Sequence, residues 1–124
     1  MTYRVRRSRS ALAAAVKGVI DAAPSAPHRI HDVAAEFGVS PFHLSRVFRA
    51  ETGISVHQYL LRIRMQQALS RLHDGEAHLS RLALDLGFSS HSHFSTIFRR
   101  HFGESPAQVR ARSITRPVPS LRNA

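Results

Sequence analysis

The sequence predicts an all-α fold of about seven helices, in which two helix-turn-helix units are joined by a long central helix. Three observations lead to this prediction: apolar residues recur at helical spacing, glycines mark the helix ends, and one stretch of the chain occurs twice. The first copy covers residues 33–55 and the second covers residues 82–105. The offset between them is 49 residues up to Ser89 and 50 from Phe94 onward.

The N-terminal segment predicts an amphipathic helix over residues 11–22, ended by Pro24 and Pro27. The residues expected on its apolar face are Leu12, Val16 and Val19 or Ile20. The same segment resembles a secretion signal, since several arginines precede an apolar run. That run covers only residues 11–16, whereas a signal needs about 7–15 apolar residues. We therefore expect the helix.

Each copy predicts a helix, a tight turn and a second helix. Gly38 and Gly87 follow the first helices, where a glycine takes the left-handed backbone that ends a helix. Ser40, and Ser89 or Ser90 in the second copy, then cap the second helices. The apolar residues expected to be buried by the second helices are Leu44, Val47 and Phe48 in the first copy and Phe94, Ile97 and Phe98 in the second.

Charge distinguishes the two helices of each copy. The second helices, expected over about 41–52 and 90–102, are the more basic ones. They carry Arg46, Arg49, Arg99 and Arg100, whereas the first helices carry Asp32, Glu36 and Asp85. A helix that enters the major groove of DNA should be the less acidic of the pair, so the pattern indicates two recognition helices.

The segment between the copies predicts one continuous helix over residues 55–72, because it lacks glycine and proline and has a broad apolar face. Capping-box spacing opens this helix at Ser55 and Gln58, and opens the last helix at Ser105 and Gln108. A helix of this length spans about 27 Å. Two units at its ends would place their second helices about one DNA turn apart, in successive major grooves.

Net charge suggests a polyanionic partner, since the 124 residues include 18 Lys+Arg against 8 Asp+Glu, a formal charge of +10. The excess is concentrated at the ends. Residues 1–27 carry five cationic side chains against one acid, and residues 110–124 carry four arginines. We expect a basic N-terminal arm over residues 1–10 and a flexible basic tail over residues 113–124. Basic ends are also typical of solvated tails, so charge alone fits both interpretations.

No pattern in the sequence predicts an enzyme. The chain has no cysteine, no His-Glu-x-x-His, no Gly-rich phosphate loop and no Gly-x-Ser-x-Gly. His91 and His93 are two residues apart on a predicted helix and do not share a face. We expect no catalytic residue, no cofactor and no metal. The longest apolar run, six residues, is far below the roughly 20 that a membrane span needs, so we expect a cytoplasmic protein without a membrane partner.

The duplicated stretch carries motifs of a known family. The segments concerned are residues 33–34, 38–40, 43–49 and 52–53 in the first copy, and Ala83 with residues 87–90, 93–95, 98–100, 102–103 and 105–106 in the second. They resemble the AraC/XylS family of bacterial transcription regulators, over about residues 11–112. The resemblance implies a seven-helix DNA-binding domain with two units, which controls transcription, usually as an activator that touches RNA polymerase. It fits a short stand-alone regulator or the isolated C-terminal domain of a longer one.

The resemblance also implies which residues meet DNA. The base-reading positions are Phe42, Ser45 and Arg46 in the first unit and His91, Ser92 and Thr96 in the second. The backbone-contacting positions are Ser40, Pro41, Arg49, Ser90 and Arg99. Arg46 can bind guanine O6 and N7 together, and Phe42 can pack on a thymine methyl group. His43 is expected to pack or cap. Thr96 stands where many relatives carry a longer side chain, so we expect the second unit to add more affinity than specificity.

The sequence therefore predicts a sequence-specific DNA-binding regulator in the bacterial cytoplasm, at the nucleoid. It is expected to bind a site of about 20 base pairs as a monomer, with residues 11–72 (including the linker helix) and 73–112 as its two units. Two alternatives remain open: a non-specific cationic protein that binds nucleic acid or membrane surfaces, and an inactive fragment of a larger ligand-responsive regulator.

Overall fold

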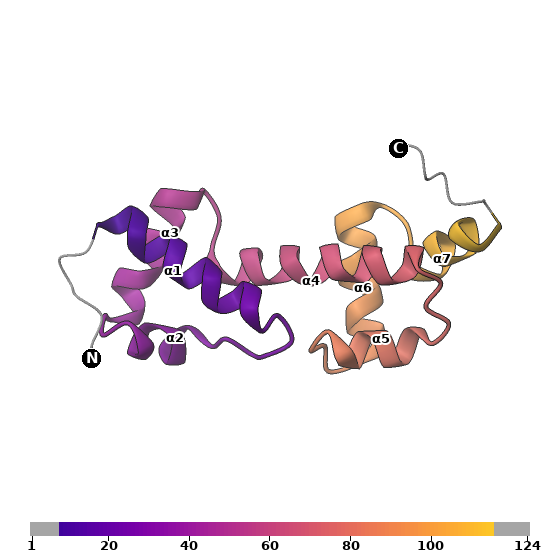
Figure 1. Cartoon of the computed structure of the whole chain (residues 1–124), viewed down its shortest axis with the longest axis horizontal. Coiled ribbons are helices and arrows are strands. Elements are labelled where there is room, and N and C mark those ends of the chain that lie inside the picture. Colours follow the sequence, from indigo (N-terminus) through magenta and orange to yellow (C-terminus); the bar gives the residue numbers. More distant parts are fainter. Residues whose placement is uncertain (1–7, 116–124) are drawn as a thin grey trace. The chain divides into compact units, whose positions relative to one another are not determined.

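The computed structural model describes residues 8–115, and this part of the chain forms seven helices and no strand (Figure 1). In chain order they are α1 (Arg9–Ala22), α2 (Ile30–Glu36), α3 (Pro41–Thr52), α4 (Val56–His73), α5 (Leu79–Asp85), α6 (His91–Phe102) and α7 (Pro106–Thr115). The all-α prediction is confirmed. The expected recognition helices correspond to α3 and α6, and the expected central helix corresponds to α4.

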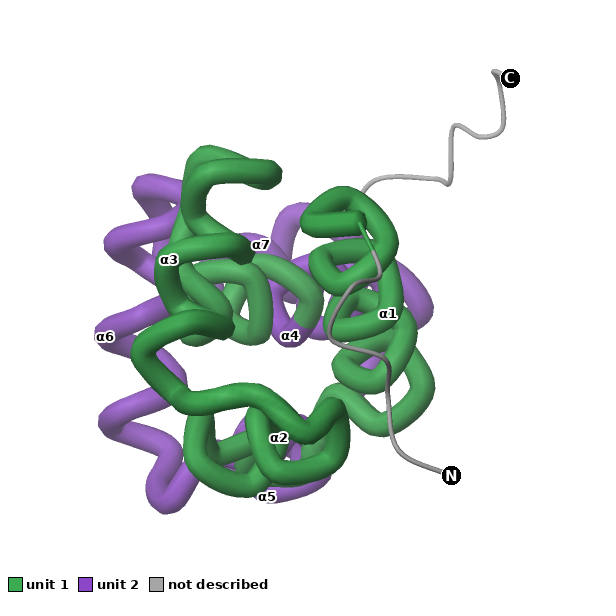
Figure 2. Tube along the Cα trace, turned by 90° about the vertical axis from the view of Figure 1, so that its left-hand side faces the viewer, with its two compact units in different colours: residues 1–63 green, residues 64–124 purple. Residues whose placement is uncertain are grey.

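Packing divides the chain into two compact units, residues 1–63 and 64–124, which Figure 2 shows in two colours. The division falls inside α4. The first two turns of this helix, up to Ile63, belong to unit 1, and the rest belongs to unit 2 together with α5, α6 and α7.

Unit 1 is built around α3, which packs against both α1 and α2. Its buried core cluster comprises Leu12, Ala13, Val16, Ile20, Val33, Ala34, Leu44, Val47, Phe48, Val56 and Leu60. The predicted apolar face of the N-terminal helix is thus confirmed, with Ile20 buried and Val19 partly buried. α1 begins at Arg9, two residues before its predicted start, because Ser8 Oγ accepts a 3.0 Å hydrogen bond from the Ala11 N–H.

The tight turn has the same hydrogen bonds in both copies. Gly38 and Gly87 have left-handed backbones, with φ of 68° and 95°. The N–H of the following residue bonds to the carbonyl oxygen five positions earlier, at 3.1 Å in the first copy and 3.0 Å in the second. This is the Schellman arrangement, which needs a residue that tolerates positive φ. The repeat in the sequence is therefore a repeat in the structure.

The predicted caps are also confirmed. Ser40 Oγ and Ser90 Oγ accept hydrogen bonds of 3.0 and 3.1 Å from backbone N–H groups in the first turns of α3 and α6. The two capping boxes form as reciprocal pairs. The bonds run from the Gln58 and Gln108 N–H groups to Ser55 and Ser105, and from the serine N–H groups back to the glutamine Oε1 atoms.

Unit 2 is built around α6, which packs against α5 and α7. Its interior contains a chain of phenylalanines, with ring centroids 5.4 Å apart for Phe88 and Phe94, 5.7 Å for Phe94 and Phe98, and 4.6 Å for Phe98 and Phe102. Arg64 is buried beside them and places its guanidinium 5.4 Å from the Phe88 ring centroid. Burial lowers the pKa of this guanidinium below its ordinary value.

A polar network holds the loop between α4 and α5. Arg71 Nη2 lies 2.6 Å from Glu76 Oε1 and 3.2 Å from Asp85 Oδ2. On the other side of the loop, Arg110 Nη1 donates a 2.6 Å hydrogen bond to the Ala77 carbonyl oxygen. These bonds join α4, α5 and α7 to one short loop, and they fix the first helix of the second copy within its unit.

The last helix ends later than the sequence predicts. α7 continues through Thr115, past the expected start of the tail at residue 113. The first residue that stops a helix here is Pro117, whose ring disfavours helical backbone at the preceding position. The rest of the predicted tail, like most of the predicted N-terminal arm, lies outside the described residues. Within residues 8–115, no helix is both long enough and apolar enough to cross a membrane.

Candidate nucleic-acid interface

The outer face of α3 carries the predicted residues of the first unit. Leu44, Val47 and Phe48 point into the core. The opposite face is exposed and contains Phe42, Ser45, Arg46 and Arg49, which recur at the spacing of one helix face. Ser40 is exposed at the helix start and Pro41 is partly buried. The structure therefore brings the base-reading and backbone-contacting positions of this unit together on one surface.

Phe42 and Arg46 touch each other on this face. The Arg46 Cζ atom lies 5.5 Å from the centroid of the Phe42 ring, a cation–π contact. Phe42 is nonetheless 72% exposed, and it is one of two large apolar side chains that are exposed in the described part of the chain. The other is Leu84 on α5. The contact orients the guanidinium without burying it, so its donors remain available to a ligand.

His43 does not pack as the sequence suggested. Its side chain is exposed, and only its backbone N–H takes part in the cap, as the donor to Ser40 Oγ. Packing and capping were both expected for His43, and of the two the structure shows the cap, through the backbone.

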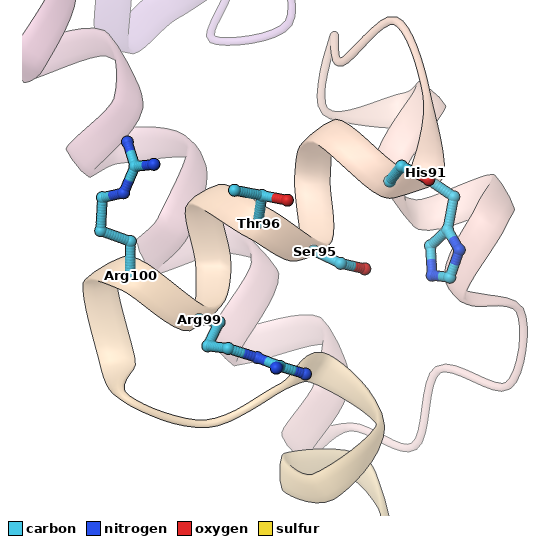
Figure 3. A pocket seen from close by; sticks show the side chains of 6 residues that line it. His91, Ser95, Thr96, Arg99 and Arg100 are labelled. Carbon is cyan, nitrogen blue, oxygen red and sulfur yellow. The ribbon is translucent and has the colours of Figure 1, made fainter.

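The outer face of α6 carries the predicted residues of the second unit. A surface depression of about 570 Å³ runs along it, and Figure 3 shows side chains of this one helix around it. Its lining residues are His91, Ser92, Ser95, Thr96, Arg99 and Arg100. Arg99 and Arg100 leave the helix in different directions (Figure 3). The predicted residues of this unit therefore lie together, and hydroxyl groups and guanidinium groups dominate the surface.

Two lining residues, Ser95 and Arg100, were not among the predicted DNA-contacting positions, although Arg100 was counted in the charge of the second helix. The repeat contained the signal for Ser95, because an offset of 50 matches it to Ser45, which was named as a base-reading position. Arg100 matches Ala50, so the first copy gave no indication of it.

The two recognition helices differ in charge. The last turn of α6 contains Arg99, Arg100 and His101, whereas the last turn of α3 contains Arg49. No acidic residue occurs in α6, and Glu51 occurs in α3. Cations near a helix C-terminus are stabilised by the helix dipole, and Arg99 with Arg100 gives α6 more positive charge than α3.

The histidines of α6 have separate surroundings. The His93 ring packs edge-on against Phe88, with centroids 5.5 Å apart, while His91 lines the depression. Among residues 8–115 no three His, Cys, Asp or Glu side chains lie together in a way that could hold a metal ion.

This pair of units, each with an exposed polar recognition helix, defines a double helix-turn-helix protein. Residues 33–112 match a family described as a helix-turn-helix domain. The chain is 40% identical over 78 residues to the HTH-type transcriptional activator RhaS of Escherichia coli, and this match covers 63% of the chain. The chain belongs to the AraC-type helix-turn-helix family.

Solved structures of the same family share the fold. A transcriptional regulator of Chromobacterium violaceum, described as AraC-type, has a TM-score of 0.77 at 28% identity, covering 86% of this chain and 96% of that one. The DNA-binding domain of AdpA, solved in complex with a target DNA, has a TM-score of 0.76 at 28% identity and covers 83% of this chain and 95% of that one. The match to RhaS spans 28% of the length of that protein.

Proposed function

We propose that this chain is a sequence-specific DNA-binding transcription regulator that inserts α3 and α6 into successive major grooves of one duplex. One observation carries the proposal. In each unit the buried side of the second helix forms the core, and the opposite side presents the predicted DNA-contacting residues to solvent. The complex of AdpA with its target DNA supports the proposal by its similarity in fold.

The two helices have different tasks in this proposal. On α3, Phe42, Ser45 and Arg46 read base edges, and Arg49 contacts phosphate. On α6, His91, Ser92 and Thr96 face the bases, but short hydroxyl side chains reach less far than arginine. Arg99 with Arg100 adds affinity through the DNA backbone, and such contacts position a protein without specifying sequence.

The proposed binding unit is a monomer on a site of about 20 base pairs, because two recognition helices in one chain replace the two halves of a dimer. α3 of unit 1 and α6 of unit 2 make the DNA contacts, and the basic ends of the chain, residues 1–10 and 113–124, add positive charge beside them. RhaS is named as an activator, and we extend that role, with RNA polymerase as the partner, to this chain. The activity is binding, without a catalytic residue, cofactor or metal. We place it in the bacterial cytoplasm, at the nucleoid.

Selection from a random library of 25-base-pair duplexes at about 150 mM salt tests the proposal. The expected result is an asymmetric motif with two conserved blocks about one helical turn apart. The apparent molecular mass of the complex with this duplex should correspond to one chain. A library without any enriched motif would contradict the proposal, and would favour a non-specific cationic binder.

A further inference from the structure

The Phe42 side chain is 72% exposed on a polar recognition helix, so this apolar ring is not stabilised by burial in the core. The core of unit 1 is already filled by residues on the other side of α3. On the exposed side of α3, the Phe42 ring contacts the Arg46 guanidinium, with 5.5 Å between the ring centroid and Cζ. The ring and the guanidinium therefore form one surface element rather than two independent side chains.

The pair of Phe42 and Arg46 is large enough to contact two neighbouring bases of one strand. Successive bases of one strand are about 3.4 Å apart along the duplex. A guanidinium that binds guanine O6 and N7 lies in the plane of that base, so its flat face is turned toward the adjacent base. The Phe42 ring centroid lies 5.5 Å from the central carbon of the Arg46 guanidinium. A methyl group at C5 of the adjacent pyrimidine can pack on the exposed part of the Phe42 ring, beside the guanidinium.

We propose that Phe42 and Arg46 act as one reader of a methyl-bearing pyrimidine next to guanine, and that 5-methylcytosine is accepted there in place of thymine. This inference rests on the proposed function and deepens it. Arg46 binds the guanine. Phe42 packs on the methyl group and is also a positioning residue, which holds the guanidinium in the plane of the guanine.

The second copy provides an internal comparison. At an offset of 50 the positions of Phe42 and Arg46 are occupied by Ser92 and Thr96, which have neither an aromatic ring nor a guanidinium. Both line the depression on α6. The half-site bound by α6 should therefore depend less on pyrimidine methyl groups than the half-site bound by α3.

The test uses the full chain and the duplex obtained by selection, with affinities measured by fluorescence anisotropy. Each thymine is replaced in turn by uracil, which removes only the methyl group. The expected result is a loss of about fourfold at one thymine next to the guanine that Arg46 reads, which is the value of one buried carbon group. Cytosine at that position should bind about fourfold more tightly once it is methylated at C5. Uracil in the other half-site should weaken binding less than this.

Variants separate packing from positioning. Replacing the guanine by 7-deazaguanine removes the N7 acceptor and should weaken binding to the wild-type protein about tenfold. Phe42→Leu keeps an apolar side chain but has no aromatic face. For this variant, the 7-deazaguanine duplex should bind almost as tightly as the guanine duplex. Phe42→Tyr keeps the aromatic face, so it should bind the 7-deazaguanine duplex about tenfold more weakly than the guanine duplex, as the wild type does. Leu84→Ala is the matched control, because Leu84 is also an exposed apolar side chain (61%) but lies on α5.

Two results would overturn the inference alone: equal binding of thymine and uracil duplexes at every position beside that guanine, or an unchanged 7-deazaguanine penalty in Phe42→Leu. In both cases a preferred motif and an Arg46-dependent guanine would still uphold the proposed function. Absence of any preferred motif would overturn both.

Discussion

The hydroxyl group of Tyr59 donates a 2.8 Å hydrogen bond to Asp21 Oδ1 and so joins α4 to the end of α1, 38 positions earlier in the chain. The Lys17 Nζ atom lies 5.7 Å from the centroid of the Tyr59 ring. The ring also packs edge-on against Phe48, with 5.8 Å between the two centroids. Burial, followed by the hydrogen bond and the charge of Asp21, raises the pKa of Tyr59 to about 12. The helix that precedes the first repeat is thus tied to the helix that follows it.

Tyr59→Phe removes only the donor of this bond. We expect the free energy of unfolding to fall by about 1 kcal/mol, the usual net value of one hydrogen bond in a partly exposed position. Chemical unfolding followed by circular dichroism measures the change. The double variant Tyr59→Phe/Asp21→Ala should be little less stable than either single variant, because each change removes the same interaction. Fully additive losses would show that the bond contributes nothing.

The raised pKa gives this bond a defined alkaline limit. Because the pKa of Tyr59 is higher in the folded chain (about 12) than its ordinary value of 10, the stabilisation is complete below about pH 10. It is lost as the pH rises from 10 through 12. The difference in unfolding free energy between wild type and Tyr59→Phe should therefore be constant from pH 7 to 9 and shrink above pH 10. A difference that does not change up to pH 12 would contradict the assignment.

Phe48 and Phe98 occupy equivalent positions in the two copies and are fully buried. We expect Phe48→Ala and Phe98→Ala each to lower the free energy of unfolding by about 3–5 kcal/mol, since each leaves a cavity in its unit. Phe42→Ala is the matched control and should change stability by less than about 0.5 kcal/mol, because that ring is exposed. Thermal melts of the three variants check the assignment, and an unchanged melt of either buried variant would contradict it.

Much of the fold was predictable because its determinants are local. Gly38 and Gly87 end helices by backbone geometry, and Ser40 and Ser90 begin the next ones by side-chain caps. Such signals act within five residues, so the sequence contains them directly. The repeat then shows that the same local signals occur twice, and it is this duplication that predicts two recognition helices.

Contacts between distant residues were not predictable in this way. Periodicity shows which face of a helix is buried but not which partner covers it, so the burial of Arg64 against Phe88 was missed. The Arg71 network likewise depends on where Asp85 lies in space. On α3, helical spacing places Phe42 and Arg46 on one face, yet their contact is a choice of rotamer that the spacing leaves open.

Glu76 supplies an acid-sensitive contact in unit 2. Its hydrogen bond from Arg71, together with a 3.1 Å bond from the His78 N–H, lowers its pKa below the ordinary value of 4.5. For a carboxyl group with a lowered pKa, the stabilisation is complete above the ordinary value and is lost as the pH falls through the lowered one. We expect Glu76→Gln to be less stable than wild type at pH 7 and the difference to disappear well below pH 4.5.

Urea unfolding at a series of pH values measures this difference. Glu104→Gln is a comparison variant, because Glu104 pairs with Arg112 on α7 and is separate from the α4–α5 loop. If Glu76→Gln stays less stable by the same amount at pH 3, the lost stability is not that of the ion pair.

Arg46 and Arg99 should respond differently to truncation, because one is proposed to bind a base and the other a phosphate. Arg46→Ala is expected to weaken binding to the preferred duplex by about 1–3 kcal/mol and to leave binding to unrelated duplexes nearly unchanged. Arg99→Ala is expected to weaken binding to all duplexes alike. It should also reduce the slope of log K against log salt concentration by about 0.9, the value for one neutralised phosphate. Titrations of both variants with preferred and scrambled duplexes at several salt concentrations measure these quantities. Equal losses on both duplexes for Arg46→Ala would remove its base-reading role, because a contact that ignores sequence cannot supply specificity.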